Sequence, residues 1–283
     1  MKRGLVVEGG AMRAIFTCGV LDALLDGKVE VDYFIGVSAG IANGVSYLSG
    51  QKHRGRDILI GYANDPRYMG TRNLFNPKNR SYYGIDFAFR EIPMVHNPFD
   101  FESYRDFRGE VKAVVSNLET GLPEYLDVEA DESMMESIIA SCSLPVMFPV
   151  KKINGTPYLD GGVSDPIPVQ KAIDDGCDRI ITILSREEGY RKGPEKGGRL
   201  AETKYRKYRD FCDTMRRRPE IYNSQVELVE ELERKGDIKV IRPVSTKGIG
   251  RLEKDTSKLM ELYMQGYESA MSRMEEIREY MMR

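Results

Sequence analysis

The sequence predicts an α/β protein with a parallel sheet and covering helices, because two strand–turn–helix units follow one another. Residues 4–7 form an apolar run that ends in glycines, and residues 14–25 have the apolar spacing of a helix. The same order recurs with a β-type run at 31–35 and a helical pattern at 41–48. Parallel strands need a crossover between them, so the two units indicate adjacent parallel strands.

Residues 51–108 interrupt this alternation with scattered Pro, Gly and Asn and with no sustained periodicity. Between Tyr62 and Phe107 lie 11 of the 26 aromatic residues of the chain. We interpret the segment as an aromatic-rich insertion. Its rings either line a pocket as a wall or lid, or bury one another in an irregular excursion.

The alternation of strands and helices resumes after the insertion. Patterns typical of a strand, a helix, an apolar loop or short strand, and a further strand lie at 111–115, 132–142, 144–150 and 179–184. Before the last of these, Asp165 has the chemistry of an N-cap and Pro166 that of a first helical residue. They predict a helix that extends to about Ala172.

The C-terminal part of the chain is expected to be helical and polar around one more strand. Residues 186–218 carry 12 Lys and Arg against 6 Asp and Glu, and predict two consecutive polar helices that break at Pro219. This basic stretch is either a solvated helical face or a surface that meets anionic lipid head groups. A strand is expected at 238–241, and a long amphipathic helix from Ser257 to the end.

Composition excludes several classes of protein. The 283 residues include 42 Lys and Arg, 44 Asp and Glu and only two His, so the formal net charge is −2. A near-neutral charge argues against general binding of nucleic acid. The four cysteines, Cys18, Cys142, Cys177 and Cys212, form no C-x-x-C pair and have no His at ligand spacing. We therefore expect no metal and no cofactor.

The sequence also carries no sign of a targeting segment or a membrane span. The N-terminal MKRGLVVEGG reaches Glu8 too soon for a signal-peptide core, and no apolar run is long enough to span a bilayer. We expect a cytoplasmic protein, and peripheral contact with the inner membrane surface stays open. The sequence does not predict an oligomeric state.

The strongest chemical signal is the G-x-S-x-G motif at Gly36-Val37-Ser38-Ala39-Gly40. A β-type run enters it and a helical pattern leaves it, which is the context of a nucleophile elbow. The flanking glycines allow a tight turn, and the N-terminus of the following helix favours developing negative charge. We interpret Ser38 as a nucleophile. The alternative is an ordinary turn in which Ser38 caps the helix.

A serine nucleophile needs donors for an oxyanion, and the first glycine turn supplies candidates. Gly9, Gly10 and Ala11 follow the first strand and lie beside Arg13. In adjacent parallel strands this turn lies next to Ser38, so its free amides and the nearby cation are expected to stabilise an oxyanion.

The alternative for this turn is a dinucleotide site with Glu30 or Asp32 as the ribose acid. Two observations count against it. The third glycine of that motif is missing, and Asp32 begins the second strand, whereas the ribose acid belongs at the carboxyl end of that strand.

The choice of base for Ser38 depends on the scarcity of histidine. An α/β-hydrolase has the chain order Ser, Asp or Glu, then His. No histidine follows His96, and His53 lies only 15 residues beyond Ser38. A triad would have to use His96 together with one of three aspartates, Asp57, Asp65 or Asp86.

Asp160 offers another base. It ends an extended stretch and precedes Gly161 and Gly162, so its carboxylate can approach another loop closely. A free Asp has a pKa of about 3.9, and burial beside Ser38 would raise that pKa toward the range of an efficient base. The alternative is the carboxylate of a common Asp-Gly turn.

Four segments together resemble the patatin-like phospholipases: EGGAMR at 8–13, GVSAG at 36–40, SIIASCSLPVMFPV at 137–150 and LDGG at 159–162. The resemblance covers roughly residues 4 to 175. It departs from the family at Ala11, where the family loop usually has a third glycine. If that position needs a positive φ, Ala11 is strained by roughly 1 kcal/mol.

The resemblance implies a three-layer α/β/α sandwich and a Ser–Asp dyad that acts on acyl esters of lipids or phospholipids without a metal. Carried over by position, Ser38 resembles the nucleophile and Asp160 the general base, and Gly9, Gly10, Ala11 and Arg13 resemble the oxyanion loop. Residues 4–175 are then expected as the catalytic domain, with the insertion at about 51–108. Residues 176–283 are expected to complete the same fold as a helical C-terminal extension.

Overall fold

The computed structural model describes residues 1–77, 81–131, 133–194 and 198–282. Within these residues, the centre is an eight-stranded sheet of order β5-β6-β3-β2-β1-β7-β8, in which β4 also pairs with β3. Five of its strands are mutually parallel: β1 (Arg3–Val7), β2 (Tyr33–Val37), β3 (Glu110–Asn117), β7 (Arg179–Ile183) and β8 (Ile238–Ile241). The others pair antiparallel: β4 (Pro123–Asp127), β5 (Lys151–Ile153) and β6 (Thr156–Asp160).

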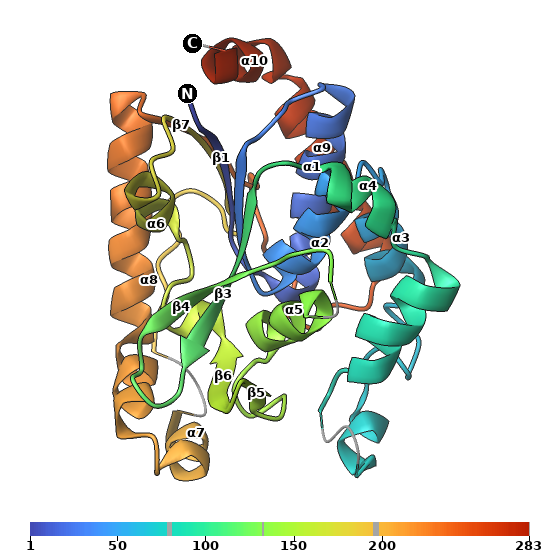
Figure 1. Cartoon of the computed structure of the whole chain (residues 1–283), viewed down its shortest axis with the longest axis vertical. Coiled ribbons are helices and arrows are strands. Elements are labelled where there is room, and N and C mark those ends of the chain that lie inside the picture. The colour runs from blue at the N-terminus through green and yellow to red at the C-terminus, as the bar shows by residue number, and fades with distance from the viewer. Residues whose placement is uncertain (78–80, 132, 195–197, 283) are drawn as a thin grey trace.

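Helices cover both faces of the sheet, and Figure 1 shows the resulting three layers. One layer holds α6 (Val169–Asp174) and α8 (Arg209–Lys235). The other holds α1 (Ala14–Asp26), α2 (Ala39–Leu48), α5 (Met134–Cys142) and α9 (Thr256–Met271). The predicted α/β/α fold class is confirmed. Among the residues that the structure describes, no helix combines the length and the apolarity needed to cross a bilayer.

The insertion, which shows no sustained periodicity in the sequence, consists of short helical pieces beside the second layer (Figure 1). They are α3 (Arg54–Gly61), a 3₁₀ turn at Thr71–Phe75, a π-helix at Phe87–His96 and α4 (Phe101–Asp106). Pro93 lies inside the π-helix. A proline lacks an amide proton and disfavours regular α-helix, which is consistent with the wider turn found there.

Alternate residues of the central strands face the two helical layers. Leu5 and Val7 of β1 pack in the apolar cluster that includes α1 and α9, while Val6 between them packs in the cluster that includes α8. All three are fully buried, as expected for a parallel strand that is covered on both faces. Burial of each side chain contributes roughly 1.5–3 kcal/mol.

The C-terminal residues are part of these layers. The predicted strand at 238–241 is confirmed as β8, which lies parallel to β7. Helix α9 contacts α1 at two glycines. A Cβ atom added to Gly19 would lie 2.0 Å from the carbonyl oxygen of Tyr263, and one added to Gly266 would lie 2.1 Å from that of Phe16. The two helix backbones therefore touch.

The predicted helix break at Pro219 is wrong. After α7 (Gly198–Tyr205), helix α8 runs from Arg209 to Lys235 with Pro219 inside it. A proline in a helix interior costs about 3 kcal/mol. Tertiary contacts on both sides offset that cost: Arg218 donates to the Gly162 carbonyl at 2.7 Å, and Tyr222 is buried in the apolar cluster next to the sheet. Residues 195–197 of the basic stretch lie outside the described residues.

The predicted capping role of Asp165 is also wrong. Helix α6 begins at Val169, with Pro168 at its N-cap position, so Pro166 is not its first residue. The Asp165 carboxylate instead accepts hydrogen bonds from the Tyr125 hydroxyl at 2.8 Å and the Gln225 amide at 2.7 Å. Both partners are distant in sequence, so the local pattern carries no sign of them.

The single long terminal helix divides into two. Helix α9 ends at Met271, and α10 (Met274–Met282) continues in a new direction at the end of the molecule where the chain begins (Figure 1). Arg273 donates to the Val240 carbonyl at 2.8 Å, and the Tyr280 hydroxyl accepts from the Ile180 amide at 3.0 Å. Contacts with β7 and β8 redirect a helix whose sequence contains no Gly or Pro at the joint.

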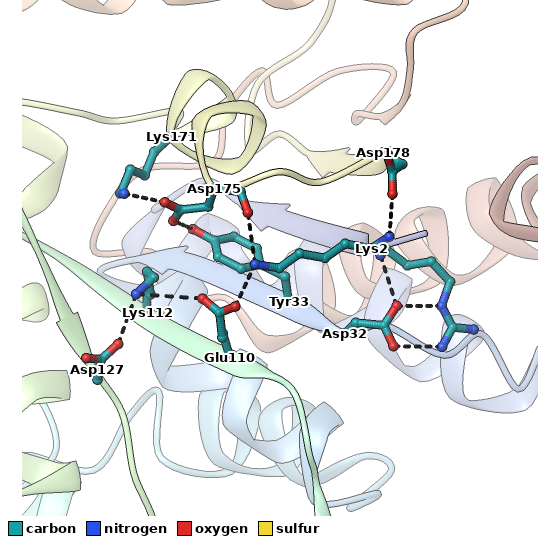
Figure 2. A network of polar contacts seen from close by, with 10 residues as sticks. Lys2, Asp32, Tyr33, Glu110, Lys112, Asp127, Lys171, Asp175 and Asp178 are labelled. Atoms are coloured by element: carbon teal, nitrogen blue, oxygen red, sulfur yellow. Dashed lines mark hydrogen bonds and ion pairs between the residues drawn. The ribbon is translucent and has the colours of Figure 1, made fainter.

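A polar network lies at the amino ends of the parallel strands, away from the glycine turns (Figure 2). It includes Lys2, Asp32, Tyr33, Glu110, Lys112, Asp127, Lys171, Asp175 and Asp178. The Asp32 carboxylate accepts from Arg3 Nε at 2.8 Å, and Glu30 pairs with the same guanidinium at 3.3 Å. Both candidate ribose acids are therefore engaged at the opposite end of the strands from the Gly9 turn.

Candidate active site

Ser38 lies in a sharp turn between β2 and α2 and has φ 54° and ψ −126°. Few non-glycine residues adopt this conformation, which costs of order 1–3 kcal/mol. The glycines on each side are required by close backbone contacts. A Cβ atom would lie 2.6 Å from the Ile41 nitrogen at Gly36, and 2.6 Å from the Val7 oxygen at Gly40. Ser38 occupies the N-cap position of α2, but its side chain makes no capping hydrogen bond.

The Gly9 turn lies directly beside Ser38. A Cβ atom on Gly9 would lie 2.9 Å from the Cβ atom of Ser38, so only glycine allows this approach. The amides of Gly9, Gly10 and Ala11 donate no hydrogen bond to any other residue that the structure describes. The turn is held from outside, because the Ser185 hydroxyl donates to the Gly9 carbonyl at 3.1 Å.

Ala11 has φ 49°, which is a left-handed backbone conformation. An alanine in this conformation is strained, as expected above for a position that needs a positive φ. We expect Ala11→Gly to raise the free energy of unfolding by about 0.5–1 kcal/mol, because glycine tolerates this φ and alanine does not. Chemical denaturation measures the change. Ala42→Gly, at a right-handed position within α2, is the control and is expected to lower the same quantity by about 1 kcal/mol. A loss of stability in Ala11→Gly would contradict the assigned strain.

Asp160 ends β6 and is 2% exposed. Its Oδ1 atom accepts from the Gly162 amide at 2.8 Å. Its Oδ2 atom is buried and has no hydrogen-bond partner of normal geometry among the described residues. Burial raises the pKa of the Asp160 carboxyl, while the nearby Ser38 side chain, the Gly162 amide and the Arg218 guanidinium act to lower it.

Strand register brings Asp160 to Ser38 although their strands do not pair. On β3, Val114 is opposite Val37 of β2, and the next residue, Val115, is opposite Asp160 of β6. Ser38, which follows Val37, and Asp160 therefore both lie beside β3, next to its neighbouring residues Val114 and Val115. Gly161 permits this packing, because a Cβ atom there would lie 2.3 Å from the Val114 oxygen.

Two cavities meet at Ser38. An apolar cavity and a polar cavity are both lined by Ala11, Ser38 and Leu144. The insertion contributes nine of the described residues that line the apolar cavity: Arg54, Ile58, Leu59, Tyr68, Tyr83, Ala88, Phe89, Pro93 and Phe99. Of the two interpretations of the insertion, the pocket wall is the one that the geometry supports. Asp160 and Arg13 line the polar cavity.

Two residues of α5 that the sequence analysis gave no role lie against Ser38. The Ser38 amide donates to the Ser141 hydroxyl at 2.8 Å, which helps to hold the strained turn. Cys142 lines the apolar cavity, and burial raises the pKa of its thiol well above the usual range. Both residues lie in the 137–150 segment, so the signal was present, but a single sequence does not say which side chains of a buried helix face a turn.

The two histidines lie away from the cavities at Ser38. Neither His53 nor His96 is among the residues that line the two cavities. His96 Nε2 lies 4.0 Å from a Glu91 oxygen, and His53 Nδ1 lies 3.1 Å from the Tyr263 hydroxyl. The three aspartates considered for a triad form ion pairs with arginines: Asp57 with Arg56, Asp65 with Arg67 and Asp86 with Arg90. The structure does not bring a histidine to Ser38.

The chain is similar to several curated proteins. Over 188 residues it is 27% identical to the uncharacterized protein YjjU of Escherichia coli (strain K12), a match that covers 63% of this chain and 50% of that protein. Over 185 residues it is 27% identical to the probable lipid hydrolase 463L of Invertebrate iridescent virus 6, covering 60% of this chain and 62% of that one. The chain thus matches about half to three fifths of the length of these relatives.

More distant likenesses extend the comparison. Lysophospholipase nte1 of Aspergillus terreus is 24% identical over 189 residues, which are 64% of this chain and 12% of that protein. The match to the crystal structure of VipD from Legionella pneumophila covers 97% of this chain and 67% of that chain, with a TM-score of 0.48 and 15% sequence identity.

Family models match two parts of the chain. The model of a domain of unknown function, DUF6363, matches residues 208–282, which include α8, β8 and α9. The model described as patatin-like phospholipase matches residues 5–173, more than half of the chain, and these residues include Ser38, Asp160 and the Gly9 turn. The chain belongs to the patatin-like phospholipase family.

Proposed function

We propose that this protein is a serine hydrolase that cleaves carboxylic acyl esters of lipids through a dyad of Ser38 and Asp160. One observation carries the proposal: a serine in a strained, glycine-flanked turn lies where an apolar cavity meets a polar cavity that holds a buried carboxylate. Relatives in the comparison carry the names lipid hydrolase and lysophospholipase, which supports the same substrate class.

The proposed reaction has two steps. Asp160 Oδ2 takes the proton of the Ser38 hydroxyl as Oγ attacks the ester carbonyl, and the raised pKa of Asp160 makes it a better base than an exposed aspartate. The free amides of the Gly9 turn stabilise the oxyanion, and Arg13 adds positive potential. The alcohol leaves with the proton, an acyl-enzyme forms on Ser38, and water then releases the fatty acid.

The apolar cavity is the proposed site of the acyl chain. Apolar side chains dominate its wall, as they do in most pockets that bind small apolar molecules. Phe89 and Pro93 of the π-helix line it, while Met94 and Val95 on the same helix are exposed to solvent. Exposed apolar residues beside the acyl site support peripheral contact with a lipid surface during substrate entry.

A fluorophosphonate probe tests the nucleophile, because an activated serine displaces its fluoride and retains the phosphonyl group. We expect labelling of the unmodified protein at Ser38, found by peptide mass spectrometry, and no labelling of Ser38→Ala. His96→Gln is the matched control and should label at the unchanged rate, since His96 lines neither cavity. Absence of labelling in the unmodified protein, or its loss in His96→Gln, would overturn the proposed dyad.

A further inference from the structure

One charged side chain lies in the wall of the apolar cavity. Arg54, the first residue of α3, lines this cavity together with Phe99 and is 7% exposed. No carboxylate and no other Lys or Arg is among the described residues that line the same cavity. Arginine is almost never buried to this extent unless it is paired with an anion. Arg54 is therefore an exception in an otherwise apolar wall.

The hydrogen bonds of the Arg54 guanidinium are incomplete. One terminal nitrogen donates to the Ser46 hydroxyl at 3.1 Å, and the other donates to the Asn97 carbonyl at 3.0 Å. The Nε atom is buried and has no hydrogen-bond partner among the described residues. Because a guanidinium has five N–H donors, these two acceptors leave donors over for a ligand.

The charge of Arg54 is also uncompensated. Within the part of the chain that the structure describes, no Asp or Glu side chain forms an ion pair with it. Burial lowers the pKa of Arg54 to about 10, and no nearby acid acts against this effect. At neutral pH the guanidinium is still protonated. A carboxylate on a ligand would supply both the missing negative charge and two acceptor oxygens.

Helix α2 separates Arg54 from the nucleophile. Along this helix the cavity is lined by Ser38, Ala39, Ala42, Asn43 and Val45. The next residue, Ser46, accepts the hydrogen bond from Arg54. Ser46 lies eight residues after Ser38, which corresponds to roughly 12 Å along a helix. The cavity therefore follows α2 from the nucleophile toward the cation.

The start of α3 is held closely against α1 and α2. A Cβ atom on Gly55 would lie 2.7 Å from the Cys18 sulfur and 2.8 Å from the Asn43 side-chain oxygen. On the other side of Arg54 in the sequence, the His53 amide donates to the Asp22 carboxylate at 2.9 Å. Both sequence neighbours of Arg54 thus fix its backbone, so the side chain reaches the cavity from a defined position.

We propose that the apolar cavity binds an acyl chain whose far end carries a carboxylate, and that Arg54 recognises this end. The inference rests on the proposed function and names the acyl group that is cleaved. The ester carbonyl would meet Ser38, the aliphatic part would lie along α2, and the terminal carboxylate would accept from Arg54. An extended aliphatic chain advances by about 1.3 Å per carbon, so a separation of roughly 12 Å suits an acyl group of about ten carbons.

A methyl-ended chain of the same length is a poorer ligand for this cavity. It would place an apolar group against the unpaired Nε atom of Arg54 and keep water from it, which leaves a buried donor without an acceptor. A carboxylate accepts there and neutralises the guanidinium. An arginine that only joined α2 to the insertion would not distinguish the two chain ends. We therefore expect the chemistry of the chain end to decide which acyl group is preferred.

The first test compares two p-nitrophenyl esters with acyl groups of equal length, the 9-carboxynonanoate and the decanoate. We expect kcat/KM of the unmodified protein to favour the carboxylated ester. In Arg54→Gln the preference should reverse, with a change of about tenfold or more in the ratio of the two kcat/KM values, because the carboxylate is then buried without its partner. Arg54→Lys keeps the charge and should retain part of the preference.

Arg56→Gln is the matched control for this comparison. Arg56 lies on the same helix, pairs with Asp57 at 2.8 Å and lines neither cavity, so its substitution should leave the ratio unchanged. Equal changes of the ratio in Arg54→Gln and Arg56→Gln would overturn the inference. A ratio near or below one in the unmodified protein would also overturn it, and that measurement does not depend on the folding of any variant.

The p-nitrophenyl ester of 10-hydroxydecanoic acid separates recognition of charge from recognition of any polar chain end. A hydroxyl can accept a hydrogen bond from Arg54, but it does not neutralise the guanidinium. We expect kcat/KM of the unmodified protein to be several-fold higher for the carboxylated ester than for the hydroxylated one. Equal values for these two esters would overturn the assignment of a carboxylate.

Binding without turnover separates this inference from the proposed function. In Ser38→Ala, calorimetry is expected to show that monomethyl decanedioate binds, that Arg54→Gln weakens this binding by about tenfold or more, and that Arg56→Gln does not change it. Such binding, without hydrolysis of any of the esters by the unmodified protein, would support the carboxylate site and refute the hydrolase. Hydrolysis of the esters without a preference that depends on Arg54 would refute the site and leave the hydrolase.

Discussion

Replacement of Ser38 by alanine is expected to lower kcat on a p-nitrophenyl acyl ester by at least about 10³-fold, because no acyl-enzyme can form. Asp160→Asn is expected to lower it by about 10²–10⁴-fold, since an amide cannot accept the Ser38 proton. In the unmodified protein, kcat/KM should fall in acid as Asp160 becomes protonated. Because burial raises the pKa of Asp160, this fall should begin at a higher pH than for an exposed aspartate.

Asp160→Asn should also make the protein more stable. The pKa of Asp160 is higher in the folded than in the unfolded chain, so its contribution to stability is present below the unfolded pKa and is lost as pH rises through the folded pKa. At neutral pH, which lies above the unfolded pKa, burial of the Asp160 carboxyl group therefore costs free energy, and an amide removes that cost. We expect Tm to rise at pH 7, by about 2–4 °C for each kcal/mol recovered.

Asp165→Asn is the matched control for these measurements. Asp165 is also a buried aspartate whose pKa is raised by burial, but it lines neither cavity and accepts from Tyr125 and Gln225. Its substitution should leave kcat/KM within about threefold, because its contacts lie away from the reacting groups. Full activity in either Ser38→Ala or Asp160→Asn would contradict the proposed dyad of Ser38 and Asp160.

The second large effect concerns the contact between α1 and α9. Gly266→Val adds a branched side chain where even a Cβ atom would lie 2.1 Å from the Phe16 carbonyl oxygen. The obstacle is backbone, which cannot rotate away, so the helices must separate and the core around them must open. We expect the free energy of unfolding to fall by about 4 kcal/mol or more, and Tm to fall by roughly 10 °C or more.

Gly61→Ala provides the control for that substitution. Gly61 ends α3, and a Cβ atom there meets nothing within 4 Å, so alanine is expected to keep or slightly raise Tm through its helix propensity. Thermal unfolding followed by circular dichroism compares the two variants. If Gly266→Val melts at the unmodified temperature, the close helix contact is not present in solution.

Much of the fold could be predicted because its signals are local. The strands that become β1, β3 and β8 are short apolar runs between turns, and α1 and α2 follow glycine turns at the expected positions. The predictions are wrong where contacts between residues distant in sequence determine the local structure. Pro219 is tolerated within α8, and the terminal helix bends near Arg273, because other elements hold the chain there.

The candidate site likewise contains some residues that the sequence predicts and others that it does not. Ser38 and Asp160 carry short motifs whose glycines are needed for close packing, so a single sequence contains their signal. The cations that line the polar cavity have no such motif. Arg186, Arg218 and Arg251 lie in polar stretches that have the composition of a solvated surface, and only the fold turns them toward a cavity that contains Arg13. No local pattern distinguishes an arginine that faces water from one that faces a site.

The meeting of two cavities at one serine also bears on the order in which products leave. Under the proposed mechanism, cleavage of the ester divides the substrate between the two cavities. The acyl group stays on Ser38 in the apolar cavity, and the alcohol lies in the polar cavity. Departure of the alcohol empties the side that holds Asp160. Water can then reach the acyl-enzyme from the side of the base, while the fatty chain still shields the other side. The alcohol is therefore the first product and the fatty acid the last.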